Sequence, residues 1–384
     1  MILVTIGSIG LGLGYLLFSG IDNANWKTLF KNCSLHKDEM YPKLKNKKKT
    51  PYGYCLRFSL PPGLSSNDFE KKQSAIEQHL GKKVQIKYKH KNILIEVYEK
   101  ELEKEYPYQK INTKGIIEFP VGYSFGGNIE TINLSEHGPH MLIAGESGSG
   151  KSTILRSILT NIILTKKKRD VKLHLIDLKK GAEFNIFRKC DIVASFSRDR
   201  EEAEKTLYKI SGEVDRRYNL FFDNDVVDIK EYNQKFKNNK LDHQIVVIDE
   251  FADLRNEDDS IEIIEELAAK ARACGIHMII ATQRPDAKVL NGRIKANVPV
   301  ILGLKTMNEI NSRIIIDHNG LEELKGKGHG ILKSGKETEI QAMYLIPNDA
   351  RDLVKHTYVE EMKPGSQFNT TGEVNDFSFL DGIK

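Results

Sequence analysis

The segment 145–152 decides the fold, and it reads Gly145-Glu146-Ser147-Gly148-Ser149-Gly150-Lys151-Ser152. It matches the pattern GxxxxGK[ST], in which glycines let successive backbone N–H groups turn towards phosphate oxygens. We expect Lys151 to reach the β- and γ-phosphates and the Ser152 hydroxyl to bind Mg²⁺. The segment therefore predicts a site for ATP and Mg²⁺, with all eight residues as candidate nucleotide-binding residues.

The flanking sequence has the arrangement that this loop requires. An apolar strand is expected over 140–144 and an apolar helix over 152–164, whose N-terminal end would lie under the phosphates. Further short apolar runs at 172–176, 245–248 and 278–281 alternate with longer helical segments. Buried strands alternating with helices predict a parallel α/β sheet.

A second catalytic element is expected after the apolar run 245–248. Asp249 follows it directly and is the candidate Mg²⁺ ligand, acting directly or through water. Glu250, one residue on, is the candidate general base for the attacking water. Taken alone, the pair could also end a strand in an ordinary acidic turn.

A third strand, 277–281, leads into Thr282-Gln283-Arg284-Pro285. A polar residue at the end of a strand beside Asp249 could sense the γ-phosphate, and Gln283 is the candidate. Without that context, Gln283 and Arg284 are plain loop residues.

Five segments within 139–332 together resemble the FtsK/SpoIIIE family of DNA-pumping ATPases. They are GESGSGKS, VVIDEFADL, KARACGIHMIIATQRP, GRIKANVP and INSRIIID, in the family's order and spacing. The resemblance implies a RecA-like motor domain that works as a hexameric ring around double-stranded DNA.

The resemblance also assigns roles to basic residues. It gives Arg272, expected on the helix after Asp249, the role of an arginine finger supplied in trans to the neighbouring subunit; without it, Arg272 is an ordinary surface arginine. Arg284, Lys295 and Arg313 match basic positions associated with the DNA-facing pore. Glu309 stands where another basic residue is expected, which puts DNA contact there in doubt.

The first 21 residues contain no charged side chain, and a bilayer core needs about 20 mostly apolar residues as helix. We expect a transmembrane helix over 1–21. A signal peptide lacks support because no positive n-region or small-residue cleavage site is visible, and a buried core helix would carry more polar positions. Lysines follow the run, which predicts a single-pass protein of the cell membrane with the bulk of the chain cytoplasmic.

The 384 residues are 40% hydrophobic and 29% charged, which excludes a disordered, collagen-like or multi-span membrane chain. The net charge of +5 conceals a surplus of eight positive charges between Asp22 and Lys110. This segment suits an anionic membrane surface, or it is a solvated linker. Four scattered cysteines indicate neither a disulfide framework nor a zinc site and fit a reducing compartment.

These observations divide the chain into five parts. They are a transmembrane helix (1–21), a basic juxtamembrane linker (22–50), a small α+β module (51–110), the ATPase motor (111–347), and a short helix with a disordered tail (348–384). Within the module we expect a strand over 52–60, a helix over 66–80 and a hairpin over 84–88 and 93–98. The fold class is α/β: a RecA-like P-loop NTPase motor with an α+β module and a transmembrane helix.

The chain combines a single phosphate loop, one anchor and a small module. In this combination it resembles the coupling ATPases of conjugative plasmids and integrative elements of Gram-positive bacteria. This resemblance implies a membrane-anchored, ATP-dependent DNA translocase that moves DNA towards a secretion channel. The implied partners are DNA without sequence preference, the membrane, a homo-hexameric ring, a relaxase and channel proteins. Alternatives are a chromosome or plasmid DNA pump in division or segregation, a type VII-like protein-export ATPase, and a nucleotide-gated scaffold. The sequence leaves open whether the DNA is single- or double-stranded.

Overall fold

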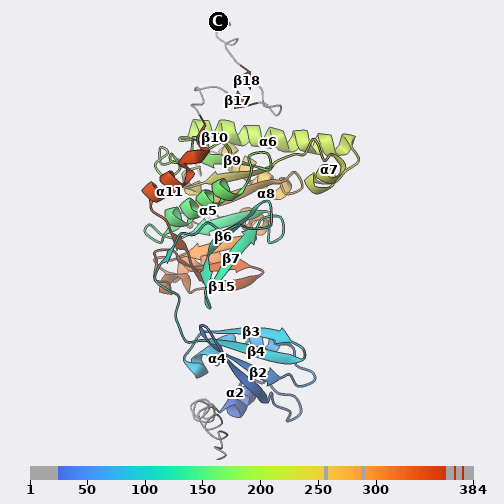
Figure 1. Cartoon of the computed structure of the whole chain (residues 1–384), viewed down its shortest axis with the longest axis vertical. Coiled ribbons are helices and arrows are strands. Elements are labelled where there is room, and N and C mark those ends of the chain that lie inside the picture. Colours follow the sequence, from blue (N-terminus) through green and yellow to red (C-terminus); the bar gives the residue numbers. More distant parts are fainter. Residues whose placement is uncertain (1–24, 255–257, 287–289, 360–366, 369–373, 376–384) are drawn as a thin grey trace, which may run out of the picture. The chain divides into compact units, whose positions relative to one another are not determined.

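The computed structural model describes residues 25–254, 258–286, 290–359, 367–368 and 374–375. The chain divides into two compact units, the first ending at Glu101 and including residues 125–127. The second unit contains the remaining residues, from Leu102 onward (Figure 1).

In its described part, from residue 25 onward, the first unit is a four-stranded antiparallel sheet with three short helices. Its strands lie in the order β1 (Leu44–Thr50), β2 (Gly53–Ser59), β4 (Asn92–Tyr98) and β3 (Val84–Lys89). The helices are α2 (Trp26–Asn32), α3 (Ser66–Glu70) and α4 (Gln73–Leu80). Phe30, Phe58 and Phe69 are fully buried in its core, so residues from α2 and α3 and the sheet share one apolar interior.

The prediction of a basic linker over residues 22–50 is wrong. Residues 26–32 form α2, and the lysine-rich stretch 44–50 forms β1, paired along its length with β2. β1 is an edge strand with mostly exposed side chains, so it has none of the apolar alternation that predicts a strand. Lysines on an edge also oppose pairing with other chains. The predicted helix 66–80 is interrupted at residues 71–72, whereas both strands of the hairpin form as predicted.

The second unit is built on a ten-stranded mixed sheet. Six strands run parallel, in the order β10 (Val193–Ser197), β9 (Val171–Ile176), β11 (His243–Ile248), β12 (Ile276–Thr282), β8 (His140–Ala144) and β13 (Val300–Leu304). Four antiparallel strands extend the sheet beyond β13: β14 (His329–Ser334), β15 (Lys336–Gln341), β6 (Glu118–Ser124) and β7 (Asn128–Asn133). The predicted parallel α/β sheet is confirmed, and the antiparallel extension is an addition to it.

Helices cover both faces of the parallel strands. Alternate residues of β11 enter different cores: Ile245 and Val247 pack in one cluster with α5 (Lys151–Thr165) and α11 (Pro347–Val354), and Val246 and Ile248 pack in the other. The second cluster includes α6 (Arg200–Asp223) and α8 (Asp258–Lys270). Burial on both faces explains why these strands are continuous apolar runs.

Smaller elements complete this unit. The short helices are α7 (Ile229–Lys235), α9 (Gly292–Asn297) and α10 (Glu309–Ile316), with 3₁₀ turns at Phe251–Leu254, Leu321–Glu323 and Lys355–Thr357. β5 (Tyr106–Pro107) pairs in parallel with β16 (Met343–Tyr344), and β17 (Gln367–Phe368) pairs with β18 (Val374–Asn375).

Two predictions fall mainly outside the described residues. The proposed transmembrane helix, 1–21, lies wholly outside them, and no helix within the described ranges is long and apolar enough to cross a bilayer. Of the predicted tail, the structure describes α11, the following 3₁₀ turn and the two short strands β17 and β18.

Candidate functional site

The sheet brings the predicted catalytic segments to one edge. β8 ends at Ala144, which lies opposite Thr282 of β12, and the loop 145–152 begins at the next residue. β11 is the parallel neighbour of β12 on its other side, so Asp249 and Gln283 leave the sheet at the same edge as the loop. Ligands in open α/β sheets bind at this carboxyl edge of the strands.

The loop takes a backbone course that only glycine allows at its last turn. Gly150 has φ +107°, and a Cβ added there would lie 2.2 Å from the backbone nitrogen of Gly328. Helix α5 begins immediately afterwards at Lys151, so its unpaired N–H groups point towards the loop. Glycine is therefore needed here for both conformation and space.

Lys151 and Asp249 are in direct contact although they are 98 residues apart in sequence. The lysine ammonium forms an ion pair with the carboxylate of Asp249 and donates a 2.8 Å hydrogen bond to its backbone carbonyl. Both side chains are almost completely buried, which makes this a strong, water-excluded contact.

Glu250 is held by donors from the end of β12. Its carboxylate accepts hydrogen bonds from the Thr282 hydroxyl (2.8 Å) and from the backbone N–H of Gln283 (3.0 and 3.2 Å to its two oxygens). Glu250 is only 4% exposed, so these contacts fix the carboxylate at the carboxyl edge of the sheet. A fixed carboxylate of this kind can accept a proton from an attacking water.

Two further residues of this site, Asp177 and Lys179, lie at the end of β9 and were not predicted from the sequence. The buried Asp177 carboxylate accepts backbone N–H groups of Lys179, Glu183 and Phe184, and burial raises its pKa above the ordinary value. This turn places the Lys179 ammonium 3.6 Å from Asp249 and 3.7 Å from Glu250. The sequence does contain a signal for Asp177, because this residue follows an apolar strand directly, just as Asp249 does.

A cavity of ≈ 400 Å³ adjoins the loop and has the chemistry to hold a magnesium nucleotide. Among its lining residues are Glu146, Gly148, Gly150, Lys151, Ser152, Thr153 and Gln283. Two buried oxygens nearby, Ser149 Oγ and Asp249 Oδ2, have no hydrogen-bond partner among the described residues, although the Lys179 ammonium forms an ion pair with Asp249 Oδ2 at 3.6 Å. Both oxygens can therefore accept a ligand contact. Ser152 and Asp249 would hold Mg²⁺ together with phosphate oxygens, the usual mode for this ion.

Arg272 lies far from the loop of its own chain. It is exposed in the turn after α8, not on the helix as predicted, and this turn precedes the first residue of β12. The six-residue rise along β12 to Thr282 separates it from the loop by about 20 Å. Arg272 therefore cannot complete the site of its own subunit.

The three residues predicted to face DNA are in different environments. Arg284 is exposed in the loop after β12. The Lys295 ammonium forms an ion pair with the Asp317 carboxylate and donates a 3.0 Å hydrogen bond to the carbonyl of Ile314, near the end of α10. Arg313 pairs with Glu309 at 3.0 Å on α10, so the unexpected acid offsets its charge.

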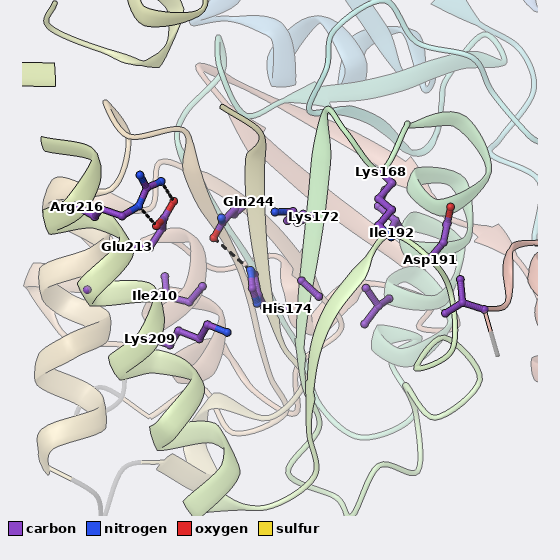
Figure 2. Close-up of a pocket in the computed structure, with 14 residues that line it drawn as sticks. Lys168, Lys172, His174, Asp191, Ile192, Lys209, Ile210, Glu213, Arg216 and Gln244 are labelled. Atoms are coloured by element: carbon purple, nitrogen blue, oxygen red, sulfur yellow. Dashed lines mark hydrogen bonds and ion pairs between the residues drawn. The ribbon is translucent and has the colours of Figure 1, made fainter. Parts of the chain in front are cut away.

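A second cavity of ≈ 280 Å³ lies at β9 and β10, beside α6 (Figure 2). His174 at its base contacts the Ser195 hydroxyl (2.8 Å) and the Gln244 amide (3.2 Å), and burial lowers its pKa to about 4. Arg216 pairs with Glu213 on α6. These polar groups satisfy one another, which is typical of a structural network.

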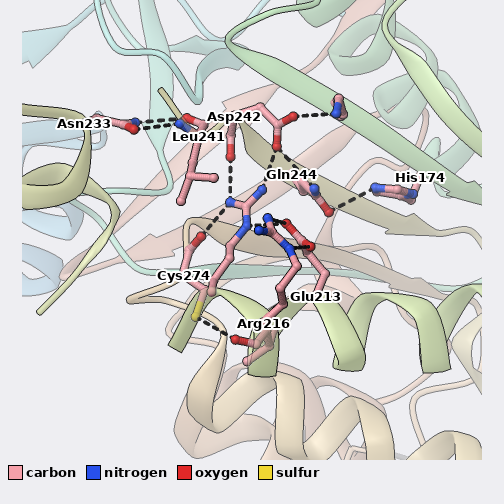
Figure 3. A network of polar contacts seen from close by, with 11 residues as sticks. His174, Glu213, Arg216, Asn233, Leu241, Asp242, Gln244 and Cys274 are labelled. Carbon is pink, nitrogen blue, oxygen red and sulfur yellow. Dashed lines mark hydrogen bonds and ion pairs between the residues drawn. The ribbon is translucent and has the colours of Figure 1, made fainter. Parts of the chain in front are cut away.

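That network continues to Glu213, Asp242 and Cys274 (Figure 3). All three contact Arg217, the largest fully buried side chain among the described residues. Its guanidinium pairs with Glu213 of α6 and Asp242 before β11, at 2.6 and 2.7 Å. It also donates to the carbonyls of Asp242 and Cys274. Arg217 thus joins α6 to the chain segments that precede β11 and β12, away from the nucleotide cavity.

Comparison with known proteins agrees with this geometry. The model of the FtsK/SpoIIIE family matches residues 104–287. A DNA translocase FtsK of Listeria monocytogenes is 34% identical over 297 residues, which are 72% of this chain and 39% of that protein. The chain thus spans well under half the length of this curated relative.

Solved structures share the fold. A structure of the pCW3 conjugation coupling protein TcpA with ATPγS has a TM-score of 0.60 and 27% identity, covering 87% of this chain and 99% of that one. The cytoplasmic domain of the type VII secretion ATPase EccC of Thermomonospora curvata has a TM-score of 0.58 at 22% identity, over 68% of this chain and 33% of that one. The chain carries a P-loop ATPase domain, and this domain belongs to the FtsK/SpoIIIE family.

Proposed function

We propose that this protein is an ATP-driven DNA translocase. The observation that carries the proposal is that Lys151, Asp249 and Glu250 lie together at the carboxyl edge of the sheet. The domain that contains them matches the FtsK/SpoIIIE family. The relatives with 34–36% identity are named DNA translocases. DNA would be gripped through its phosphates, without sequence readout and with strong salt dependence.

The chain's own residues divide the hydrolysis reaction between them. Water attacks the γ-phosphorus of ATP, and the bond to the β-phosphate oxygen breaks, which releases ADP and phosphate. The loop amides and Lys151 bind the phosphates, Ser152 and Asp249 hold Mg²⁺, and Glu250 orients the attacking water and accepts its proton. Gln283, whose backbone holds Glu250 while its side chain lines the cavity, is placed to sense the γ-phosphate.

We further propose that the motor works as a homo-hexamer in which Arg272 completes the neighbouring site. The support is its exposure about 20 Å from its own loop, which excludes a role in its own site and leaves the side chain accessible to a neighbouring subunit. Mixing Arg272→Ala with Glu250→Gln subunits tests this, because some mixed interfaces regain an intact pair. Partial recovery of hydrolysis supports the assignment, and complete absence of activity in every mixture contradicts it.

The conjugative coupling role is the finer proposal. Its support is the likeness to the coupling protein TcpA, which extends over 87% of this chain and 99% of that one. In this role the 1–21 segment anchors the protein in the cell membrane by a single pass, the bulk of the chain is cytoplasmic, and a relaxase and channel proteins are partners. A reporter fused after Lys384 would report a cytoplasmic C-terminus; an external one would contradict the topology.

Stimulation of ATP hydrolysis by nucleic acid tests the main proposal. The full chain should hydrolyse ATP several-fold faster with double-stranded DNA, and the stimulation should decline between low and high salt because counterion release drives binding. Comparison with single-stranded DNA identifies the preferred form. Absence of stimulation by either form would favour protein export, for which the likeness to EccC supports only the fold.

A further inference from the structure

The segment Lys325-Gly326-Lys327-Gly328, between the 3₁₀ turn 321–323 and β14, contacts the phosphate loop directly. The backbone N–H of Gly328 donates a 2.7 Å hydrogen bond to the carbonyl of Ser149. The two segments lie so close together that a Cβ on Gly150 would clash with the Gly328 backbone. β14 is antiparallel to β13, the parallel neighbour of β8. The beginning of β14 therefore lies at the same edge of the sheet as the phosphate loop.

Lys327 has a backbone conformation that is unusual for its residue type. Its φ is +54°, between glycines at +76° and +90°. Two hydrogen bonds hold this backbone in place. The Gln341 side-chain amide donates a 2.8 Å hydrogen bond to the Lys327 carbonyl, and the Ala342 N–H donates a 2.9 Å hydrogen bond to the Gly328 carbonyl. Non-glycine residues held at positive φ cluster at functional sites, so a lysine here, where glycine or asparagine fits more easily, needs a reason.

The side chain of Lys327 supplies that reason. Lys327 is an exposed residue that lines the ≈ 400 Å³ nucleotide cavity together with Gly150 and Lys151. Glu105 and Glu146 also line the cavity, and the Lys327 ammonium forms no salt bridge with any described residue. Lys327 is on the β13–β14 side of the loop, whereas Asp249 and Glu250 are on the β11–β12 side.

We propose that the Lys327 ammonium binds the phosphate chain of the nucleotide, as a second cation of the same subunit that complements Lys151. A cation on the side of the loop away from Glu250 would contact the phosphate chain, away from the attacking water. We expect that contact to be equally strong in the ground state and in the transition state of hydrolysis. Uniform binding of this kind lowers KM and leaves kcat nearly unchanged. Lys327 is thus a nucleotide-binding residue of the ATPase site, independent of any DNA contact.

Lys327→Gly is the sharpest test, because glycine removes the ammonium and also relieves the left-handed backbone. We expect the affinity of the full chain for both ADP and a non-hydrolysable ATP analogue to fall about tenfold, as for loss of one charge-assisted contact. The KM for ATP should rise similarly, with kcat within about threefold of wild type. Lys327→Arg should retain most of the affinity.

Lys325→Ala is the matched control, since it removes a lysine of the same segment that does not line the cavity. Wild-type affinity in Lys327→Gly, or an equal loss in Lys325→Ala, would overturn the proposal, as would a loss confined to kcat. If Lys327→Gly fails to fold, Lys327→Asn, which also tolerates positive φ, gives the same comparison. No DNA is present, so the outcome is separate from that of the translocase proposal.

Discussion

At the scale of single residues, the site depends on a few positions whose chemistry and backbone geometry agree. Lys151, Asp249, Glu250 and Gln283 could be named from the sequence because each follows a short apolar run or stands within a known loop pattern. Their contacts with Thr282 and Lys179 could not, since these depend on which strands become neighbours. Lys327 belongs to no motif recognised in the sequence. Its positive φ and its place beside the phosphate loop become known only with the backbone structure.

Gly150→Ala should abolish nucleotide binding while the protein remains folded. The new Cβ would meet the Gly328 backbone at 2.2 Å, and φ +107° is strained for alanine, so the loop must move to relieve both. Equilibrium binding of a labelled ATP analogue measures the effect. Gly212→Ala is the control, because that helical glycine of α6 has nothing within 4 Å of an added Cβ. Undiminished binding by Gly150→Ala would contradict the proposed loop geometry.

At the scale of elements, prediction succeeded where burial gives a clear pattern. The parallel strands are apolar on both faces and were found, whereas β1 is a lysine-rich edge strand whose pairing no local signal reveals. The antiparallel strands β14 and β15 were missed for a related reason: they are partly exposed, and neither has the apolar–polar alternation or the continuous apolar run that predicts a strand. Buried polar groups such as Arg217 were missed too, because charge in a sequence predicts exposure.

Arg217→Ala should destabilise the second unit by about 3–5 kcal/mol, the usual cost of breaking a buried charge network. Glu213 and Asp242 would lose a partner, and two backbone carbonyls would lose their donor. Denaturant unfolding measures the free energy. Arg216→Ala, a half-exposed neighbour that pairs with the same Glu213, should cost about 1 kcal/mol or less. Equal effects of the two substitutions would contradict the assigned role of Arg217.

At the scale of the whole molecule, three buried histidines and the half-buried His243 contribute to the response to acid. Burial lowers the pKa of His140, His174 and His243 to about 4 and that of His277 well below 6.5. The unfolded chain therefore binds protons below pH 6.5 that the folded chain does not, so stability is complete above pH 6.5 and is lost as pH falls towards 4.

The expected acid effect reaches about 1.4 kcal/mol per pH unit for each histidine between these limits. Thermal unfolding midpoints at pH 7.5, 6 and 5 measure it, and they should fall steadily below pH 6.5. Substitution of His174 by Gln, which keeps a hydrogen-bonding amide, should reduce the slope. A midpoint that is constant from pH 7.5 to 5 would contradict buried, neutral histidines.

We propose above all that ATP hydrolysis moves the whole protein along DNA. Displacement of a third DNA strand from a duplex by the full chain tests this most directly, because only a motor that travels along the duplex removes that strand. We predict displacement that requires ATP, is lost in Lys151→Ala and Glu250→Gln, and persists in Glu201→Gln, an exposed acid of α6. Hydrolysis of ATP without displacement, or equal displacement by Lys151→Ala, would contradict the claim.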